Sequence, residues 1–86
     1  MKDKLTIKDK NGIECNYDIL FELEVEDKKI IAYTKYEKDN DKIICYSSYI
    51  DKKNILTDIT KEEDLKLIDI TLKTLEKSSK INYKKA

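Results

Sequence analysis

Alternating apolar and polar residues predict β-strands along the chain as far as residue 59. Residues 4–9 form a short run, and an Asn-Gly pair at 11–12 predicts the tight turn of a hairpin. A second run over residues 13–26 is unusually long; its odd-numbered residues would share one face, and only Leu20 breaks the alternation. Because ordinary strands are shorter than this run, we expect a bend or bulge near residues 18–20.

Three further runs predict the remaining strands, over residues 29–36, 42–50 and 55–59. The polar segment 37–41 separates the first two of them and suits a hairpin turn. Both of these strands carry apolar residues at successive positions, so that neither of their faces is wholly polar. Strands of this kind belong at the centre of a sheet or against a partner.

A helical period replaces the strand alternation after residue 60. Thr60 and Glu63 fit a capping box, in which each side chain accepts a hydrogen bond from the backbone N–H of the other residue, and they predict the start of a helix. Apolar residues then recur at spacings of three and four, which is the pattern of a helix packed on one face. They are Leu65, Ile68, Leu72 and Leu75.

These elements predict one α+β domain over residues 1–79, followed by a lysine-rich tail over residues 80–86. We expect an antiparallel meander sheet of four to five strands with one C-terminal helix packed on one face. One helix leaves the other face of the sheet uncovered, and Leu67 and Ile70 lie about opposite the apolar stripe of the helix. A homodimer is therefore one hypothesis for what covers the remaining apolar surface.

The chain lacks His, Arg, Pro, Trp and Gln, which excludes most familiar catalytic and metal-binding motifs. Asp39-Asn40-Asp41 resembles the start of a calcium loop, but that pattern requires a glycine and a glutamate where this chain has Ile44 and Ile50. Cys15 and Cys45 form no CxxC pair, and we expect two reduced, packed thiols. The sequence predicts no metal and no cofactor.

The sequence offers no general base that could activate a serine nucleophile. Ser47 and Ser48 would need a general base, and without histidine that base would have to be a desolvated lysine, which nothing in the pattern places beside them. Carboxylate pairs are numerous, but the charged face of a strand produces such pairs by default. We therefore predict that the protein is not an enzyme; an enzyme that uses lysine or carboxylates alone is the least favoured hypothesis.

Charge is balanced over the whole chain but uneven along it. Eighteen lysines balance eighteen carboxylates, whereas residues 13–27 contain six carboxylates and no lysine. One interpretation is a solvated strand face; the other is a docking surface for a basic partner. Glu22, Glu24 and Glu26 alternate along this strand at about 6.6–6.8 Å, a spacing comparable with that of phosphates in a nucleic-acid strand. Asp27 follows directly.

Direct binding of nucleic acid and insertion into a membrane are not expected. The chain has six tyrosines that could stack on bases, but this mode usually requires a basic groove, and the nearest strand is acidic. No run approaches the ~20 apolar residues of a membrane span, and the N-terminal residues do not resemble a signal peptide. The sequence therefore predicts a protein of the cytoplasm.

Several segments together resemble the YrzB-like family of small uncharacterised bacterial proteins. The resemblance covers roughly residues 3–77 and depends on the segments 5–9 with 11–12, 20–23, 31–35 and 46–49, and on the capped helix from Thr60. It implies an intracellular bacterial protein with a strand meander followed by a helix, and it implies no active-site residues. The chain departs from the strongly acidic balance of that family.

The sequence thus favours a small non-enzymatic interaction or regulatory protein with a protein partner. The alternative is a phage-type inhibitor, similar in role to an anti-CRISPR protein, that presents its acidic strand to a basic nucleic-acid-binding enzyme. The expected partner-binding residues are Glu22, Glu24, Glu26, Asp27, Leu67 and Ile70.

Overall fold

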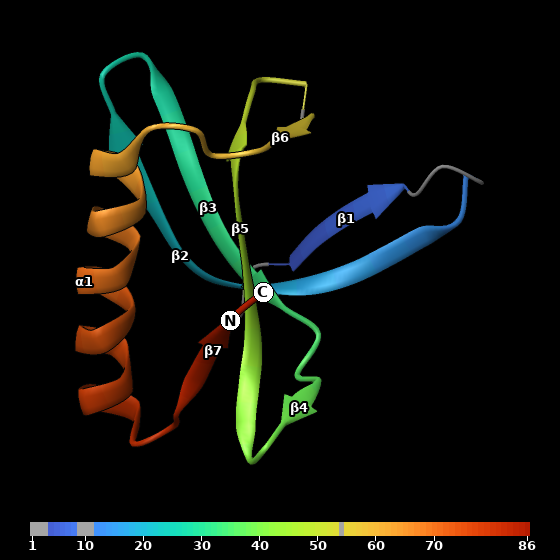
Figure 1. Cartoon of the computed structure of the whole chain (residues 1–86). Coiled ribbons are helices and arrows are strands. Elements are labelled where there is room, and N and C mark those ends of the chain that lie inside the picture. Colours follow the sequence, from blue (N-terminus) through green and yellow to red (C-terminus); the bar gives the residue numbers. More distant parts are fainter. Residues whose placement is uncertain (1–3, 9–11, 54) are drawn as a thin grey trace.

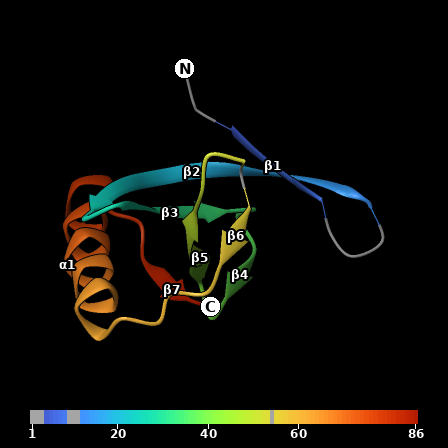
Figure 2. The same ribbon diagram turned by 90° about the horizontal axis from the view of Figure 1, so that it is seen from above.

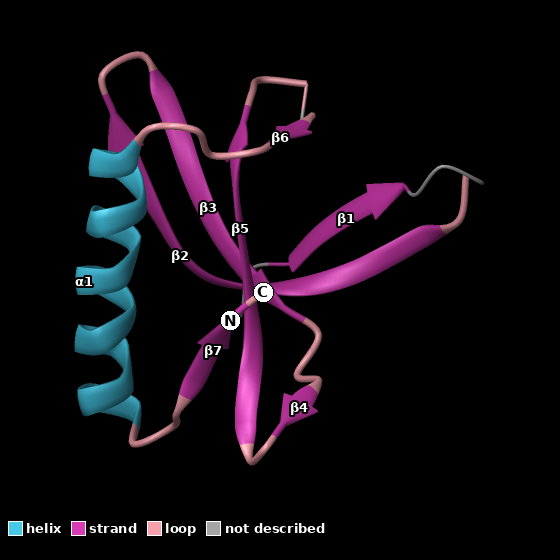
Figure 3. Cartoon of the chain, viewed as in Figure 1, coloured by secondary structure: helices cyan, strands magenta, loops and turns pink. Residues whose placement is uncertain are grey.

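The computed structural model describes residues 4–8, 12–53 and 55–86, with the backbone alone at residues 7 and 8. The described elements, in chain order, are β1 Lys4–Lys8, β2 Glu14–Val25, β3 Lys28–Thr34, β4 Lys38–Asp39, β5 Lys42–Ile50, β6 Leu56–Thr57, α1 Glu62–Ser79 and β7 Tyr83–Lys85 (Figures 1 and 3). The predicted α+β class, an antiparallel sheet with a single C-terminal helix, is confirmed. No helix among these residues is long and apolar enough to span a membrane.

The sheet is built around β5, which has neighbours on both edges. The strand order is β1-β2-β3-β5-β4, and β6 and β7 also pair with β5. The Ile44 N–H donates to the Glu37 carbonyl at 2.8 Å, and the Ile43 N–H donates to the Asn82 carbonyl at 2.9 Å. Because successive N–H groups of a strand point to opposite edges, the β4 segment and β7 flank β5 on opposite sides.

The bulge in β2 turns the two halves of this strand toward opposite faces of the sheet. The pairing register shifts between Ile19 and Phe21, so Leu20 is the extra residue. Tyr17 packs on the face away from α1, whereas Phe21 and Leu23 pack on the face that α1 covers. The predicted bulge is confirmed, but the expectation that all odd-numbered residues of this strand share a face is wrong, because the extra residue reverses the alternation.

The face that α1 covers, called the helix face below, holds two apolar clusters. Ile68 of α1 packs in one cluster with Ile30 and Tyr49, and Leu72 packs in the other with Ala32. Ile30 and Ile68 are fully buried. Burial of such side chains against the sheet supplies most of the stability of a helix of this size.

The opposite face, called the open face below, has its own apolar cluster. Its buried residues are Leu5, Ile31 and Tyr33. The half-buried residues around them are Tyr17, Ile19, Tyr46, Ile50 and Leu56. Leu5 belongs to the same cluster as Ile31 although β2 lies between their strands, so the sheet is curved on this side. The prediction that the central strands are apolar on both faces is confirmed, and no helix covers the open face in the described part of the chain.

The start of α1 differs from the predicted capping box. Lys61 is the N-cap residue and makes no side-chain cap hydrogen bond, so the box of Thr60 and Glu63 is wrong. The first turn instead carries three carboxylates, which favour the positive end of the helix dipole. Electrostatics rather than a side-chain cap therefore stabilises this helix end.

A buried hydrogen bond fixes the first turn of α1 to the sheet. The Tyr49 hydroxyl donates to Asp64 Oδ2 at 2.5 Å, and both residues are buried. This hydrogen bond raises the pKa of Tyr49. Asp64 thus occupies the inward position, and Leu65, expected in the apolar stripe, is 39% exposed.

Residues 80–86 do not form the predicted tail. Lys80 ends α1 in the left-handed conformation, with its N–H donating to the Glu76 carbonyl at 2.9 Å. The chain then reverses, and β7 runs parallel to β5, with Tyr83 paired to Ile43. Tyr83 is buried in the helix-face cluster that contains Leu72. The lysine-rich segment that the sequence predicts to be solvated therefore contributes Tyr83 to the core.

Two turns were predicted from their residues. The predicted segment 37–41 contains the short strand β4, and the hairpin turn is confined to Asn40 and Asp41, which both have positive φ, as in a type I′ turn. Of the predicted Asn-Gly turn, Asn11 lies outside the described residues. Gly12 has a φ of 78°, a value that glycine adopts without strain.

Candidate interaction surface

Only part of the predicted acidic row lies along β2 on the open side of the sheet, because β2 ends at Val25 and Glu26 turns toward the start of α1. Phe21 and Leu23 point to the helix face, so the intervening Glu22 and Glu24 point away from it. Glu22 and Glu24 on β2 are exposed, and so are Glu26 and Asp27 in the turn that follows. The structure therefore brings the four acidic residues together at one end of the β2–β3 hairpin.

Lysines from neighbouring elements pair with alternate carboxylates of this row. Lys29 Nζ lies 3.5 Å from Glu22 Oε2, and Lys61 Nζ lies 3.3 Å from Glu26 Oε2. The hydrogen bond to Glu26 raises the pKa of Lys61. Glu24 has no ion pair with any residue that the structure describes. The row is therefore a mixed-charge surface rather than an uninterrupted line of negative charge.

Two adjoining hollows form a groove on this side of the molecule. The first has a volume of about 400 Å³ and the second a volume of about 510 Å³. The residues that line both hollows are Lys29, Ile50, Asp51 and Lys52. Only the first is also lined by Glu24, Glu26, Asp27 and Lys28. Only the second is also lined by Lys4, Leu5, Thr6, Ile19, Glu22 and Ile31.

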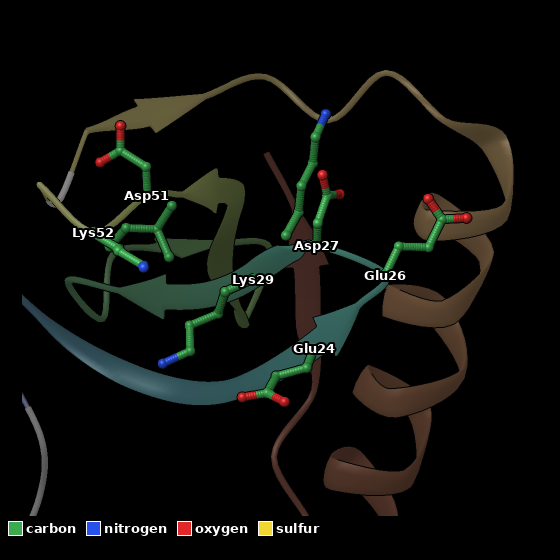
Figure 4. Close-up of a pocket in the computed structure, with 8 residues that line it drawn as sticks. Glu24, Glu26, Asp27, Lys29, Asp51 and Lys52 are labelled. Atoms are coloured by element: carbon green, nitrogen blue, oxygen red, sulfur yellow. The ribbon is translucent and has the colours of Figure 1, made fainter.

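Secondary structure positions the charged rim of the groove. Figure 4 shows Glu24, Glu26 and Asp27 on the β2–β3 hairpin, with Asp51 and Lys52 on the turn after β5. That turn is fixed by Asp51, whose Oδ1 accepts the N–H groups of Lys53 at 2.8 Å and Ile55 at 3.0 Å. The first hollow therefore lies between two turns at the end of the sheet and the strand ends that lead into them.

The floor of the second hollow is made of apolar side chains, but the surface that this hollow exposes is mainly polar. Leu5 and Ile31 are buried beneath it, and Ile19 and Ile50 are half-buried. The hydroxyl group among the described lining residues is that of Thr6, which donates to Asn16 Oδ1 at 2.9 Å. A small exposed apolar area within a charged rim is one arrangement that binding surfaces use. Volumes of this order are those of ligand and peptide sites.

The other two predicted partner-binding residues lie on α1. Ile70 is 63% exposed, as expected from its place opposite the apolar stripe. Leu67 is only half-buried, and it contributes less exposed surface than expected. Neither residue lines the groove. The predicted set thus divides between two surfaces, the acidic hairpin and the helix.

The tyrosines separate into groups on the two faces. On the open face the Tyr33 and Tyr46 rings stack with centroids 5.7 Å apart, and the Tyr17 ring lies edge-on to Tyr33 at 4.9 Å. Lys35 Nζ lies 5.2 Å from the Tyr17 ring centroid. The Tyr46 hydroxyl donates to Glu37 at 2.8 Å, and this bond raises the pKa of Tyr46. The rings therefore contact one another and a lysine of the same chain.

The serines and cysteines that the sequence analysis considered as reactive groups have structural surroundings in the described part of the chain. Ser48 is buried, and its hydroxyl lies 3.2 Å from the Tyr33 hydroxyl. No group of His, Cys, Asp or Glu residues among those that the structure describes could hold a metal ion. Cys15 and Cys45 are free thiols, as expected, on strands that β3 separates.

Burial makes Cys45 a probe of stability at alkaline pH. Burial of Cys45 raises the pKa of its thiol from 9.0 to about 11, although the positive charge of Lys85 lowers this pKa. Between these pH values the unfolded chain releases a proton that the folded protein keeps. The associated stability is present below pH 9 and is lost as the pH rises toward 11.

We expect the free energy of unfolding of the wild-type protein to fall by about 2–3 kcal/mol more than that of Cys45→Ala between about pH 8 and pH 11. Urea unfolding of both proteins at each pH measures this difference. Burial also raises the pKa values of Tyr33 and Tyr83, but these residues are common to both proteins. Parallel pH profiles would contradict the assignment to Cys45.

Sequence reasoning missed the groove because its walls come from distant parts of the chain. Lys4, Lys29 and Lys52 meet there through the pairing of four strands, and no local pattern marks them. The only available signal was the prediction that the central strands are apolar on both faces. Comparison of the chain with family models, curated proteins and solved structures gives no match in any of the three.

Proposed function

We propose that this protein is a small non-enzymatic interaction protein that binds a segment of another protein along the groove on its open face. The occupant we infer is an extended peptide with an apolar side chain flanked by charges of both signs. The apolar side chain would lie on Ile19 and Ile50, and its flanking charges would meet the lysines and carboxylates of the rim.

The observation that carries this proposal is the difference between the two faces of the sheet. The helix face is closed by Ile68 and Leu72 of α1. The open face keeps Ile19, Ile50 and Leu56 only half-buried, and a charged rim surrounds part of it. Interfaces commonly combine an apolar centre with a polar rim, whereas single exposed hydrophobes are scattered.

The inhibitor alternative has less support from the geometry. It requires a row of unpaired carboxylates, but Lys29 and Lys61 already pair with Glu22 and Glu26. Surface ion pairs of this kind contribute only about 0–1 kcal/mol, so a strongly basic partner could displace them. Membership of the YrzB-like family and a location in the cytoplasm remain predictions from the sequence.

Site-specific crosslinking tests the proposal. A photoreactive benzoylphenylalanine replaces Ile50 in the groove or, as the control, Ile70 on α1, and each protein is irradiated in a lysate of the native host. We expect one crosslinked protein from position 50 and none from position 70. The rim variant Lys52→Glu, combined with the position 50 probe, should reduce that product. Crosslinking at position 70 alone would move the interface to the helix and contradict the proposal.

A further inference from the structure

Part of β2 has an edge with no neighbouring strand in the described chain. β1 pairs with residues 14–18 of β2, and β3 pairs with β2 from Asp18 onward. Asp18 pairs with both strands, so β1 and β3 lie on opposite edges of β2. Residues 14–16 therefore have β1 on one edge only. This half of β2 projects with β1 beyond the rest of the sheet, away from α1 (Figures 1 and 2).

Most of this edge lacks the features that keep other strand edges apart, although Lys35 lies over the Tyr17 ring at its end. Natural proteins protect exposed edges with lysines, prolines or bulges. The outer strand β1 carries Lys4 and Lys8, and β7 carries Lys84 and Lys85. The segment 13–17 contains no lysine and no proline. A hairpin that projects on its own is also only marginally stable without further packing.

We propose that two copies of the chain pair antiparallel along this edge, about a two-fold axis through Cys15. Residues directly opposed in an antiparallel pair point to the same face, so such an axis must pass through a residue. An axis through Glu14 would oppose it to its own copy, and an axis through Asn16 would oppose Glu14 to Asp18. Among the axes through residues 14–16, only the axis through Cys15 places no carboxylate against another, because it opposes Glu14 to Asn16 of the second copy.

The same register joins apolar side chains that one copy leaves exposed. Ile13, which is 59% exposed, would face the half-buried Tyr17 of the second copy. Pairs of an aromatic and a β-branched residue are favourable across antiparallel strands. The two Cys15 residues would lie opposite each other on the open side, with Cα atoms about 4.5–5.5 Å apart. The pairing would therefore extend the sheet through both copies and leave both grooves free.

Two changes of one residue test the register. Asn16 is exposed, and its side chain accepts a hydrogen bond from the Thr6 hydroxyl. Asn16→Lys removes this acceptor, whereas Asn16→Glu keeps acceptor oxygens, so the loss of this bond would act against the expected difference. We expect sedimentation equilibrium to show a dimer whose dissociation constant is about tenfold lower for Asn16→Lys than for Asn16→Glu, because each change acts twice across the axis. Unfolding midpoints of both variants confirm that they fold.

Crosslinking gives an independent reading. A short bis-maleimide should join two wild-type chains through Cys15, and Cys15→Ser should abolish this product, whereas Cys45→Ala should retain it. A monomer at every concentration, equal dissociation constants for the two Asn16 variants, or a dimer that does not crosslink through Cys15 would each overturn the proposal. A dimer insensitive to Asn16 would assign self-association to another surface. The groove proposal does not depend on this result.

Discussion

Replacing Ile68 with alanine should lower the free energy of unfolding by about 2–5 kcal/mol. Ile68 is fully buried between α1 and the sheet, where it packs with Ile30 and Tyr49. The change removes apolar contacts and leaves a cavity that rigid strands cannot close. Because small domains have about 5–15 kcal/mol of stability in total, the loss should be evident as a large shift in the urea midpoint.

Ile70→Ala is the matched control, since it makes the same chemical change on the same helix. Ile70 is 63% exposed, so its replacement should alter stability by no more than about 0.5 kcal/mol. If both variants lost similar stability, the assignment of the inner face of α1 would be wrong.

Replacing Tyr83 with alanine should have an effect of similar size, about 3–5 kcal/mol. Tyr83 is buried in the cluster of Leu72, Ala32 and Cys45, and it holds β7 against β5. Its loss should also open Cys45 to solvent, because β7 covers that part of β5. We therefore expect two effects in Tyr83→Ala, a lower urea midpoint and faster reaction of Cys45 with a thiol reagent.

Lys84→Ala is the control for the second prediction. Lys84 is the neighbouring residue of β7 and forms an ion pair with Asp39 at the surface. An exposed pair of this kind contributes about 0–1 kcal/mol, and Cys45 should stay protected. Full stability of Tyr83→Ala would show that residues 81–86 contribute nothing to the core, as the sequence pattern alone suggested.

Local sequence patterns predicted the strands and the helix in which apolar residues recur at regular spacings. The alternation over β2 is strong because each half of this strand buries one face, whereas β3 and β5 carry apolar residues at successive positions because they pack on both faces. The break at Leu20 located the bulge correctly, since an extra residue must disturb a period of two. The consequence of the bulge was missed, because a local pattern does not show that the two halves of β2 pack against different elements.

The errors arose where tertiary contacts override local preference. β7 is short and lysine-rich, and it forms only because β5 offers an edge and Tyr83 finds an apolar site. The inward position at the start of α1 is a carboxylate because Tyr49 supplies a buried hydrogen-bond donor to Asp64. Neither interaction can be read from hydrophobic periodicity, since both partners are distant in sequence.

The candidate site was predictable only in part. The acidic residues of the β2–β3 hairpin lie close together because they are neighbours in sequence. The lysines that pair with these acidic residues are not all their neighbours in sequence. Lys61 is 35 positions from Glu26 and reaches it because α1 begins beside the hairpin. Charge patterning alone therefore overestimated the negative charge of this surface, and the groove between the hairpin and the turn after β5 had no sequence signal.

The most direct test of the central claim is a binding titration with the partner identified by crosslinking. The protein's affinity for that partner is measured by calorimetry for the wild type, for Ile50→Lys in the groove and for Ile70→Lys on α1, after unfolding curves establish that all three are folded. We expect Ile50→Lys to weaken binding at least about tenfold, because it places a charge on the apolar floor, and Ile70→Lys to bind as the wild type does. Unchanged affinity for Ile50→Lys together with lost affinity for Ile70→Lys would contradict binding at the open face.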